Sequence, residues 1–313
     1  MLNLITEALK KAENILILTH LNPDGDALGS TAGFKLMLEK MGKKATILLE
    51  KEPAPMFSVF GNNFSWGEAK GDFDLVVALD CGDKKRLGEC EEYFKGNTIS
   101  IDHHISNSRF ADINYVVPDA SATGEIVCEF IKHSGVEFTS EMATVIYGAI
   151  LTDTGGFMFS NTTKKTHLIA GELIGLGADY YTLNKKLIQE KDYKRHLVSA
   201  YAIENAEFEA DGKICVCLFD NELCNKLQMD DEDLAGLAQI TRSITGVEVG
   251  VLITEISKGI IKVSLRSDEL CNVSQVAEAF GGGGHIRASG VRFRDKAPIE
   301  VKELIVKEIM KQL

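Results

Sequence analysis

Cysteine pairing motifs are missing from this 313-residue chain. Its seven cysteines are odd in number, and no two of them stand in a C-x-x-C arrangement. This argues against a disulfide framework. Cys215 and Cys217 alternate along a predicted strand, as two small apolar side chains on one face would. We therefore expect seven reduced thiols in a cytoplasmic protein.

Long apolar runs are also lacking. No run approaches the roughly 20 residues of a membrane-spanning helix, so we expect no association with a membrane. The first 14 residues predict an amphipathic helix rather than a signal peptide, because one helical face carries Leu2, Ile5, Leu9 and Ala12.

Positive charge is scarce, since 34 Lys and Arg stand against 46 Asp and Glu, a formal net charge of −12. A long nucleic-acid duplex requires a broad basic surface, and this composition gives no sign of one. A small anion that is held by metal ions or by a few local cations is still compatible with this balance.

The length suits two domains, because a domain usually spans about 100–200 residues. From residue 15 to about 150, strand-like runs alternate with helical ones, which predicts an α/β domain: a doubly wound, mainly parallel sheet with helices on both faces. Strands are expected near residues 15–19, 44–49, 75–79 and 98–101. Helices are expected near residues 26–41, 84–94, 121–133 and 140–152.

The pattern changes in the second half. A helical stretch follows over about 163–205, and after it a smaller α+β domain is expected. Its strands are predicted near 206–210, 213–218, 247–255 and 260–266, and its helices near 220–240, 273–280 and 298–312. The acidic run Asp230–Asp233 suits a helix N-terminus, where negative charge is favourable. The expected division is a first domain over 1–185, a helical connector over 186–205 and a C-terminal domain over 206–313.

Four apolar elements end abruptly in acidic or imidazole side chains. The first is the run that begins at Ile15, a predicted buried strand that a proline and a glycine then break. The side chains at these ends are His20, Asp24 and Asp26 after the first element, Asp80 after the second, Asp102, His103 and His104 after the third, and Asp153 after the fourth. Open α/β sheets bind ligands at the carboxyl ends of their strands, so these side chains converge if the elements are neighbours.

Imidazole and carboxylate ligands together suit a hard or borderline divalent cation, and Mn²⁺ fits this set better than Mg²⁺. Four carboxylates at one place would repel each other, and two dications would cancel their charge. Two metal ions about 3.5–4 Å apart are the usual arrangement for phosphoester hydrolysis. The predicted metal ligands are therefore His20, Asp24, Asp26, Asp80, His103 and Asp153.

Each piece of this pattern has an ordinary explanation when it stands alone. An Asp-Gly-Asp sequence is common in turns, a lone Asp often caps a helix, and an adjacent pair of histidines is a weak signal. The conjunction carries the prediction, because every piece falls at the end of an apolar element.

The first half of the chain resembles the DHH phosphoesterase superfamily, whose four motifs correspond in order to His20-x-Asn22-x-Asp24-x-Asp26, Asp80, Asp102-His103-His104 and Thr152-Asp153-Thr154-Gly155. Near the other end, Gly282–Gly290 is similar to the G-G-G-H-x-x-A-x-G signature of the domain that commonly follows a DHH domain. The resemblance covers nearly the whole chain. By size and layout it is greatest to the stand-alone nanoRNase and pAp-phosphatase members.

The resemblance implies a role for each residue. One Mn²⁺ would be held by His20, Asp24 and Asp80, and a second by Asp26, Asp80, His103 and Asp153, so that Asp80 bridges them. Mg²⁺ or Co²⁺ would be the substitutes. Asp102 would orient a neighbouring imidazole, and His104 would face the substrate phosphate as a catalytic group. Asn22, within the first motif, is assigned to substrate binding.

A glycine-rich segment, Gly281–Gly284, precedes His285. Its backbone N–H groups can approach an anion closely, although a bare glycine run is more often a flexible turn. The resemblance implies that the substrate is held away from the scissile bond by Gly283, Gly284, His285, Arg287 and Arg266. An exposed edge charge is the ordinary explanation for Arg266, and the family pattern leaves position 287 variable. We expect a clamp with the site in a cleft between the domains, which favours short substrates.

Three functions stay open. The first is a Mn²⁺-dependent phosphoesterase that degrades short single-stranded RNA oligonucleotides to mononucleotides and removes the 3′-phosphate of 3′-phosphoadenosine 5′-phosphate (pAp). The second is a phosphodiesterase of cyclic dinucleotides or their linear dinucleotide products, which would share the catalytic core. The third is a non-catalytic nucleotide-binding protein, against which the intact set of ligands argues. Oligonucleotide length, cleavage direction and oligomeric state, a homodimer included, stay open as well.

Overall fold

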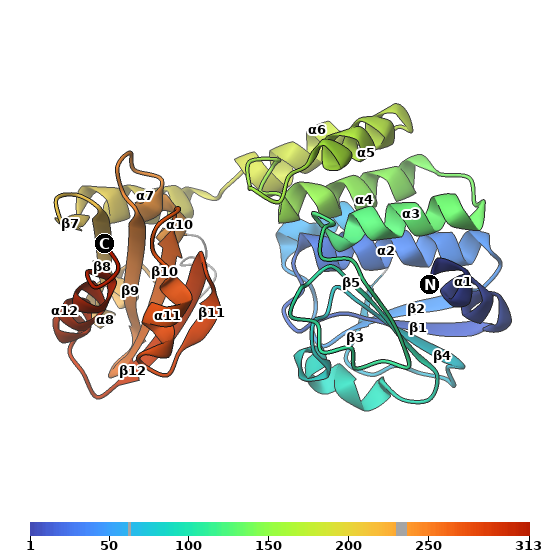
Figure 1. Ribbon diagram of the computed structural model, residues 1–313, viewed down its shortest axis with the longest axis horizontal. Coiled ribbons are helices and arrows are strands. Elements are labelled where there is room, and N and C mark those ends of the chain that lie inside the picture. Colours follow the sequence, from blue (N-terminus) through green and yellow to red (C-terminus); the bar gives the residue numbers. More distant parts are fainter. Residues whose placement is uncertain (62–63, 230–236) are drawn as a thin grey trace. The chain divides into compact units, whose positions relative to one another are not determined.

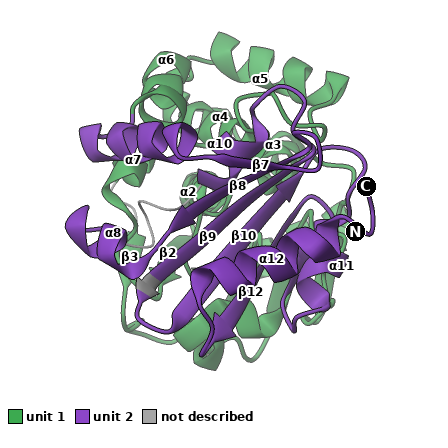
Figure 2. Cartoon of the chain, turned by 90° about the vertical axis from the view of Figure 1, so that its left-hand side faces the viewer, with its two compact units in different colours: residues 1–190 green, residues 191–313 purple. Residues whose placement is uncertain are grey.

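The computed structural model describes residues 1–61, 64–229 and 237–313, and the chain divides into two compact units, Met1–Glu190 and Lys191–Leu313 (Figures 1 and 2). The predicted helix near 220–240 lies partly outside these described residues, and the acidic run Asp230–Asp233 lies wholly outside them. Among the described residues, no helix combines the length and the apolar character that crossing a bilayer requires.

Six parallel strands form the sheet of the first unit, in the order β3-β2-β1-β4-β5-β6. They are β1 (Asn14–Leu18), β2 (Lys44–Leu49), β3 (Phe64–Trp66), β4 (Leu75–Leu79), β5 (Thr98–Asp102) and β6 (Ile113–Val116). The strand order reverses between β1 and β4. A reversal of this kind leaves a crevice at the carboxyl ends of the two strands, where doubly wound sheets bind their ligands.

Helices cover one face of this sheet. In Figure 1, α2 and α3 lie on this side, and α4 packs against these two helices. The helices of the unit are α1 (Leu2–Lys11), α2 (Gly25–Lys40), α3 (Thr123–Ser134), α4 (Ser140–Asp153), α5 (Lys164–Gly175) and α6 (Tyr180–Leu183), with a 3₁₀ segment η1 (Pro55–Phe60) and a π-helical segment η3 (Asn184–Gln189). Ile15 and Ile17 of β1 face this layer and pack in one core with Leu28 and Ile146.

The opposite face of the sheet is covered by a shorter helical segment. Leu16 and Leu18 of β1 point to this side and share a second core with Leu87 and Cys90. These two residues belong to η2 (Lys84–Tyr93), a 3₁₀ segment where the sequence predicted a regular helix. The backbone at Gly88 has φ 61°, a left-handed conformation that interrupts a helix.

The second unit contains a mixed six-stranded sheet in the order β11-β12-β10-β9-β8-β7. Its strands are β7 (Glu207–Glu209), β8 (Ile214–Phe219), β9 (Val249–Ser257), β10 (Ile260–Ser267), β11 (Gly283–His285) and β12 (Ala288–Arg294). Only β8 and β9 run parallel to each other among its described pairs. The α/β first unit and the smaller α+β second unit confirm the predicted fold class.

Two helical layers enclose the second sheet. Its helices are α7 (Tyr193–Glu204), α8 (Asn221–Lys226), α10 (Leu237–Arg242), α11 (Val273–Glu278) and α12 (Pro298–Ile309). Figure 2 shows α12 in front of the strands, where its Ile305 packs with Val263 and Val291. On the other face, Val198 of α7 and Leu237 of α10 pack with Phe219.

Four strands of the two sheets were not predicted: β3, β6, β11 and β12. β3 and β11 have three residues each, too few for an alternating pattern to register. The predicted loop at the glycine-rich segment is therefore partly wrong, because Gly283–His285 pairs with Gly290, Ser289 and Ala288 of β12 as an edge strand.

Candidate metal centre

The carboxyl ends of β1, β4 and β5 lie side by side in the first sheet, and the end of α4 joins them. The structure brings the six predicted metal ligands together there. They form two groups whose ligand atoms lie within 4.8 Å of one another, His20 with Asp24 and Asp80, and Asp26 with His103 and Asp153. A third group, Asp80 with His103 and His104, overlaps both. Asp80, at the end of β4, is a member of the first group and lies 3.6 Å from His103 of the second. The site thus occupies the crevice that the reversal of strand order creates.

The first group joins β1 to β4. His20 Nε2 lies 3.9 Å from Asp24 Oδ2 and 3.8 Å from Asp80 Oδ2. His20 and Asp80 are buried, whereas Asp24 is exposed. Asp24 also caps α2, because its Oδ1 accepts hydrogen bonds from the backbone N–H groups of Asp26 and Ala27. One carboxylate oxygen of Asp24 therefore starts the helix, and the other faces His20.

The second group adds β5 and two helices. His103 Nε2 lies 3.8 Å from Asp26 Oδ2, 3.6 Å from Asp153 Oδ2 and 3.6 Å from Asp80 Oδ1. Asp80 thus presents Oδ2 to the first group and Oδ1 to the second. Its backbone has φ 55°, a conformation uncommon outside glycine. Strained backbone of this kind concentrates at functional sites.

These separations fit a shared cation. They are too long for direct hydrogen bonds, whereas two ligand atoms about 2.1 Å from one ion lie roughly 3–4 Å apart. Nitrogen and carboxylate oxygen are also the donors that Mn²⁺ and similar divalent ions accept. The residues present therefore fit two divalent ions with Asp80 between them.

Both imidazoles are held with Nε2 toward the carboxylates. His20 Nδ1 lies 2.8 Å from the carbonyl oxygen of Leu21, and His103 Nδ1 lies 3.1 Å from that of Ala120. A backbone carbonyl can only accept, so each Nδ1 carries the proton and each Nε2 keeps a lone pair for an ion.

The carboxylates are poorly compensated by the protein alone. Burial, followed by the charges of Asp80 and Asp153, raises the pKa of Asp26 well above its ordinary value. Burial and the charge of Asp24 likewise raise the pKa of Asp80. Burial, together with nearby carboxylates, raises the pKa of Asp153 to about 6. Cations at this place would relieve the repulsion and displace these protons.

The affinity for metal ions should therefore decrease as the pH is lowered. A carboxyl group with a raised pKa keeps its proton until the pH exceeds that pKa. Below that pH, a metal ion must displace the proton in order to bind. The Asp153 pKa of about 6 alone predicts at least about fourfold weaker Mn²⁺ binding at pH 5.5 than at pH 7.5. Calorimetric titration in buffers of different ionisation enthalpy would measure the affinity and the protons released. Equal affinity at both pH values without proton release would contradict the clustering.

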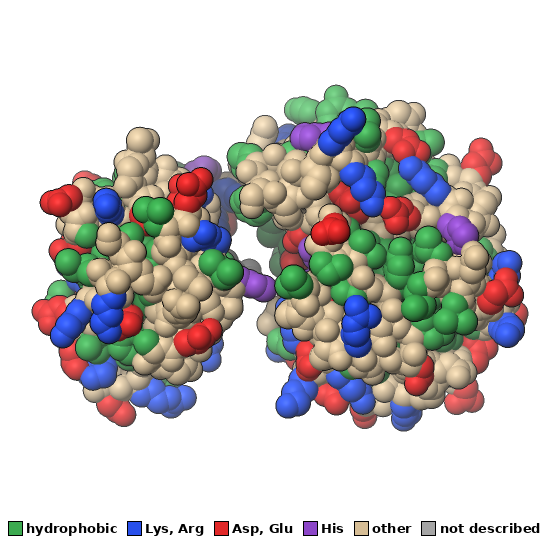
Figure 3. Space-filling model, in the orientation of Figure 1, with side chains coloured by type: hydrophobic (Ala, Val, Ile, Leu, Met, Phe, Trp, Pro, Cys, Tyr) green, Lys and Arg blue, Asp and Glu red, His purple; other side chains and the backbone are tan. Residues whose placement is uncertain are grey.

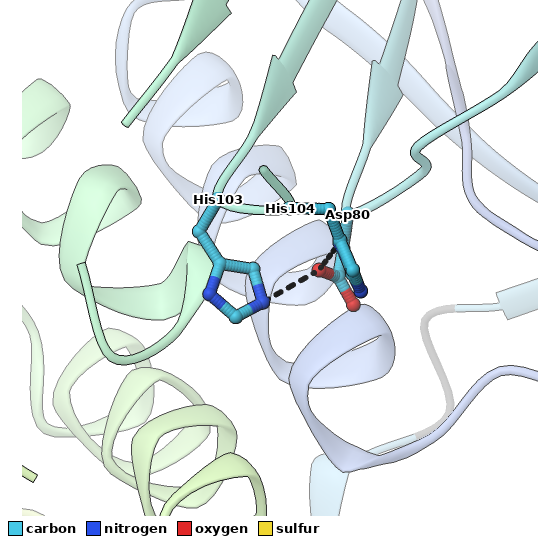
Figure 4. A group of neighbouring side chains, drawn as sticks. All are labelled: Asp80, His103 and His104. Atoms are coloured by element: carbon cyan, nitrogen blue, oxygen red, sulfur yellow. Dashed lines mark ion pairs between the residues drawn. The ribbon is translucent and has the colours of Figure 1, made fainter. Parts of the chain in front are cut away.

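His104 belongs to a different network. Its Nδ1 donates a hydrogen bond to Asp102 Oδ1 at 2.7 Å, and this bond raises the pKa of His104 to about 9. Nδ1 also lies 3.7 Å from Asp80 Oδ1, but it is already engaged by Asp102. Figure 4 shows Asp80 between His103 and His104, with a dashed line to each. His104 therefore lies beside the six candidate ligands, and its Nε2 forms no hydrogen bond with any residue that the structure describes.

Asn107 completes this network and was not predicted. Its Nδ2 donates to Asp102 Oδ2 at 2.7 Å, while the backbone N–H groups of His103 and His104 donate to Oδ1. Burial alone would raise the Asp102 pKa, but the bonds from His104 and Asn107 hold it below its ordinary value. The chain Asn107–Asp102–His104 fixes the imidazole as a catalytic triad does.

Sequence reasoning also missed the groups that hold Asp26 and Asp80. The Asp26 carboxylate accepts from the backbone N–H groups of Thr123 and Gly124, at 2.7 and 2.9 Å, and from Ser30 Oγ at 2.9 Å. Thr123 Oγ1 donates to Asp80 Oδ1 at 2.9 Å. The N-terminus of α3 therefore binds the carboxylate of Asp26, as helix N-termini commonly bind anions. No local sequence pattern predicted this contact.

The position of Asp153 depends on close packing of α2 against α4. A Cβ added at Gly29 would lie 2.4 Å from the carbonyl oxygen of Val145 and 2.8 Å from Ala149 Cβ. Gly25 and Gly33, four residues to either side, also face α4 at less than 3 Å. These three glycines let the helices approach until Asp26 and Asp153 share one site.

Gly29→Ala should therefore destabilise the protein by about 1–3 kcal/mol through overpacking and weaken metal binding. Gly171→Ala is the matched control, because Gly171 of α5 is exposed and has nothing within 4 Å of an added Cβ. That change should stabilise by about 0.5–1 kcal/mol. Thermal unfolding of both variants tests the assignment, and a Gly29→Ala protein as stable as the Gly171→Ala protein would refute it.

Asn22 has a structural explanation as well as the predicted role in substrate binding. It is exposed and has φ 52°, a left-handed conformation that Asn tolerates better than most residues. Its place in the loop between His20 and Asp24 brings it near the first group, and the turn itself accounts for the residue type.

Two predicted substrate residues of the second unit, Arg266 and His285, lie in register with each other across its sheet. Ala288 of β12 pairs with His285 on one side and with Arg266 on the other. His285 is exposed, and burial lowers the pKa of the half-buried Arg266. Arg287 is engaged differently, because its guanidinium donates to the carbonyl oxygens of Cys271 and Glu269 at 3.0 and 2.6 Å. Those bonds brace the loop before α11.

Comparison with known proteins decides the family. Residues 14–150 match the family model for the DHH family, N-terminal domain, and residues 211–313 match that for the DHHA1 domain. The chain is 30% identical to a probable bifunctional oligoribonuclease and PAP phosphatase NrnA of Streptococcus mutans, over 91% of each chain. The chain belongs to the DHH family. A bifunctional oligoribonuclease and PAP phosphatase NrnA of Thermus thermophilus is 31% identical, over 100% of this chain and 94% of that protein.

A solved structure agrees with this assignment to the DHH family. The crystal structure of an exopolyphosphatase-related protein from Bacteroides fragilis is similar to this chain with a TM-score of 0.92 at 25% identity, covering 99% of this chain and 95% of that one. The predicted family is therefore confirmed over nearly the whole length, and the Asp-His-His sequence of the DHH name stands here at the end of β5.

Proposed function

We propose that this protein is a metal-dependent phosphoesterase that degrades short single-stranded RNA oligonucleotides to mononucleotides and removes the 3′-phosphate of pAp. The observation that carries the proposal is the pair of ligand groups that share Asp80, whose two oxygens face different imidazoles. The activities for which the two NrnA relatives are named support the choice of substrates.

We assign two Mn²⁺ ions to the site, with Mg²⁺ or Co²⁺ as substitutes. His20, Asp24 and Asp80 would hold one ion, and the other would be held by Asp26, Asp80, His103 and Asp153. When bound, such a pair supplies a nucleophile at neutral pH and stabilises the attacking and leaving oxygens of the phosphoryl group. The imidazole nitrogens favour Mn²⁺ over Mg²⁺, which prefers oxygen ligands.

His104 supplies the catalytic group that the protein itself contributes. Asp102 accepts a hydrogen bond from the proton-bearing Nδ1 of His104, so Nε2 is available to a phosphate oxygen. A protonated imidazole at that atom would stabilise the charge that develops in the transition state, or donate its proton to the leaving oxygen. Asp102 and Asn107 keep the ring oriented for that task.

In the C-terminal unit, we assign Arg266 and His285 to the substrate, with the backbone of Gly283 and Gly284 beside them. His285→Ala and Arg266→Ala should each lower kcat/KM on RNA dinucleotides by about ten- to a hundredfold, since a hydrogen bond to a charged group contributes about 1.5–3 kcal/mol. The same variants should leave hydrolysis of a small generic phosphodiester nearly unchanged. Kinetics on both substrates test this assignment. Equal losses on the two would place His285 in the chemistry instead.

The test of the proposed function is a substrate panel. The purified protein with Mn²⁺ is incubated with RNA dimers and longer oligomers, with pAp and with cyclic dinucleotides, and initial rates are compared. Fastest turnover of RNA and pAp supports the proposal, and fastest turnover of cyclic dinucleotides would favour the related phosphodiesterase. Absence of hydrolysis in a protein that binds metal and nucleotide would mean a non-catalytic binding role.

We also propose that the protein acts in the cytoplasm. All seven cysteines are free and buried, which suits a reducing compartment.

Figure 3 shows acidic and basic side chains interspersed on the visible side of both units. This mixture supports a preference for short substrates over long duplexes.

A further inference from the structure

The loop that joins β6 to α3 becomes buried at residue 120, and the burial continues through the first turn of the helix. We call residues 120–125 the entry loop. Loops usually lie on the surface, because the polar groups of a buried backbone need hydrogen-bond partners inside the protein. The partners that the backbone of the entry loop has found therefore indicate what this loop supports.

Several of these partners are candidate metal ligands. The carbonyl oxygen of Ala120 lies 3.1 Å from His103 Nδ1 and orients that imidazole. The backbone N–H group of Thr123 donates to Asp26 at 2.7 Å, and the hydroxyl group of the same residue donates to Asp80 at 2.9 Å. The entry loop thus contacts three of the four side chains that we assign to the second ion.

The fourth side chain is connected to the entry loop through Asn161. Its Nδ2 donates to the carbonyl oxygen of Ser121 at 3.0 Å and to the carbonyl oxygen of Asp153 at 3.1 Å, and it lies 3.5 Å from Asp153 Oδ2. By contrast, His20 and Asp24 form no hydrogen bond with the entry loop among the described residues. A displacement of this loop would therefore disturb the whole ligand set of the second ion and only the shared ligand of the first.

One pair of side chains ties the entry loop to its helix. Ser121 Oγ donates to Glu125 Oε1 at 2.6 Å, and both residues are at most 1% exposed. The only other polar side chain of the loop, that of Thr123, donates to Asp80 instead, and alanine and glycine occupy the remaining positions. The Ser121–Glu125 hydrogen bond is therefore the side-chain contact that holds the loop in shape from within.

Glu125 is a costly residue for a purely structural role at the start of a helix. Glutamate is rarely buried completely, yet Glu125 has no exposed surface. Its Oε2 has no hydrogen-bond partner among the described residues, because Lys165 Nζ lies 3.9 Å away, which is too far for a hydrogen bond. Burial of a polar atom without a partner costs free energy. This cost is understandable if the bond to Ser121 serves the metal site rather than the stability of α3.

We propose that Ser121 and Glu125 are positioning residues of the second metal site. Their hydrogen bond fixes the entry loop, and the loop holds the four side chains of that site at separations that one ion can span. The proposal rests on the two-ion assignment of the proposed function. It adds two residues that form no hydrogen bond with any candidate ligand side chain and act only through the loop.

Three substitutions isolate this hydrogen bond. Ser121→Ala removes the donor, Glu125→Met removes the acceptor at a similar side-chain length, and Glu125→Gln keeps an acceptor oxygen for Ser121. Thr98→Val is the matched control, because it also removes a buried hydroxyl group, which donates to Asp112 at 2.7 Å. Thr98 begins β5, whereas the ligands follow the other end of that strand. Thermal unfolding checks that all four variants fold.

Calorimetric titration with Mn²⁺ is the first measurement. Ser121→Ala and Glu125→Met should weaken one of the two sites by about ten- to a hundredfold, as changes to groups that support a metal ligand do. Glu125→Gln and Thr98→Val should bind both ions as wild type does. Hydrolysis of pAp by the Ser121→Ala protein should be impaired at limiting Mn²⁺ and restored at saturating Mn²⁺, because Ser121 only positions the ligands. Unchanged affinity in Ser121→Ala and Glu125→Met, or an equal loss in Thr98→Val, would overturn the proposal.

Hydrogen exchange in the metal-free protein separates this inference from the proposed function. The backbone N–H groups of Thr123 and Gly124 donate to Asp26, so their exchange rates in EDTA report whether the entry loop stays in place. Both should exchange about tenfold faster in Ser121→Ala than in Thr98→Val, since a buried acceptor has lost its partner. Faster exchange would support the positioning role even if wild type hydrolyses no substrate. Unchanged exchange would refute that role even if wild type hydrolyses RNA and pAp.

Discussion

Asp80→Asn should abolish hydrolysis of every substrate, with a loss of about a thousandfold or more. Changes to groups that merely support a metal ligand cost 10–100-fold, and Asp80 lies between both groups of candidate ligands. Its two oxygens lie 3.8 Å from His20 Nε2 and 3.6 Å from His103 Nε2. A neutral amide offers one weak oxygen and cannot bridge two cations. Steady-state kinetics on RNA dinucleotides and pAp at saturating Mn²⁺ is the measurement.

Stability provides a second readout for the same variant. Burial and the charge of Asp24 raise the Asp80 pKa in the metal-free protein, so an ionised Asp80 costs folding free energy at neutral pH. Removing that charge should leave the melting temperature in EDTA unchanged or higher. Asp72→Asn, at the exposed turn before β4, is the control and should keep full activity. An active, folded Asp80→Asn protein would exclude the two-ion site.

His104→Ala should lower kcat by about a hundred- to ten-thousandfold on all substrates, with little change in KM. That range is typical of a lost general acid or charge-stabilising group. Metal content should not change, because His104 Nδ1 donates to Asp102 and is not oriented as a ligand. His167→Ala is the matched control, since His167 of α5 stacks on Phe157 and has no assigned role.

The pairing of kinetics with metal analysis distinguishes two roles for His104. A kcat loss with two ions retained identifies a residue of the chemistry. Loss of one ion with His104→Ala would instead make His104 a ligand, as its 3.7 Å distance from Asp80 Oδ1 allows geometrically. Rescue of the ion by added Mn²⁺ without rescue of kcat would again favour the catalytic role.

The sequence pointed to the candidate ligands that the structure brings together, because each candidate follows an apolar element whose end is visible in the pattern. β1 ends before His20, β4 before Asp80 and β5 at Asp102. Asp153 was found in the same way, although its element is a helix, because the apolar run of α4 also ends there. The local sequence pattern was therefore sufficient to predict that these candidate ligands lie together.

The supporting groups could not be predicted, because they come from distant parts of the chain. Thr123 reaches Asp26 and Asp80 only when α3 lies beside α2, and Asn107 reaches Asp102 only through the loop after β5. Contacts across the sheets, rather than local pattern, create these features.

The most direct test of the two-ion site is a count of the ions. The protein is stripped with EDTA, titrated with Mn²⁺ and analysed by calorimetry and by metal content after dialysis. Wild type should bind two Mn²⁺ per chain, and the His20→Ala protein should keep one, because the group around His103 is intact. Wild type that binds a single ion, or none while still hydrolysing RNA, would contradict the account.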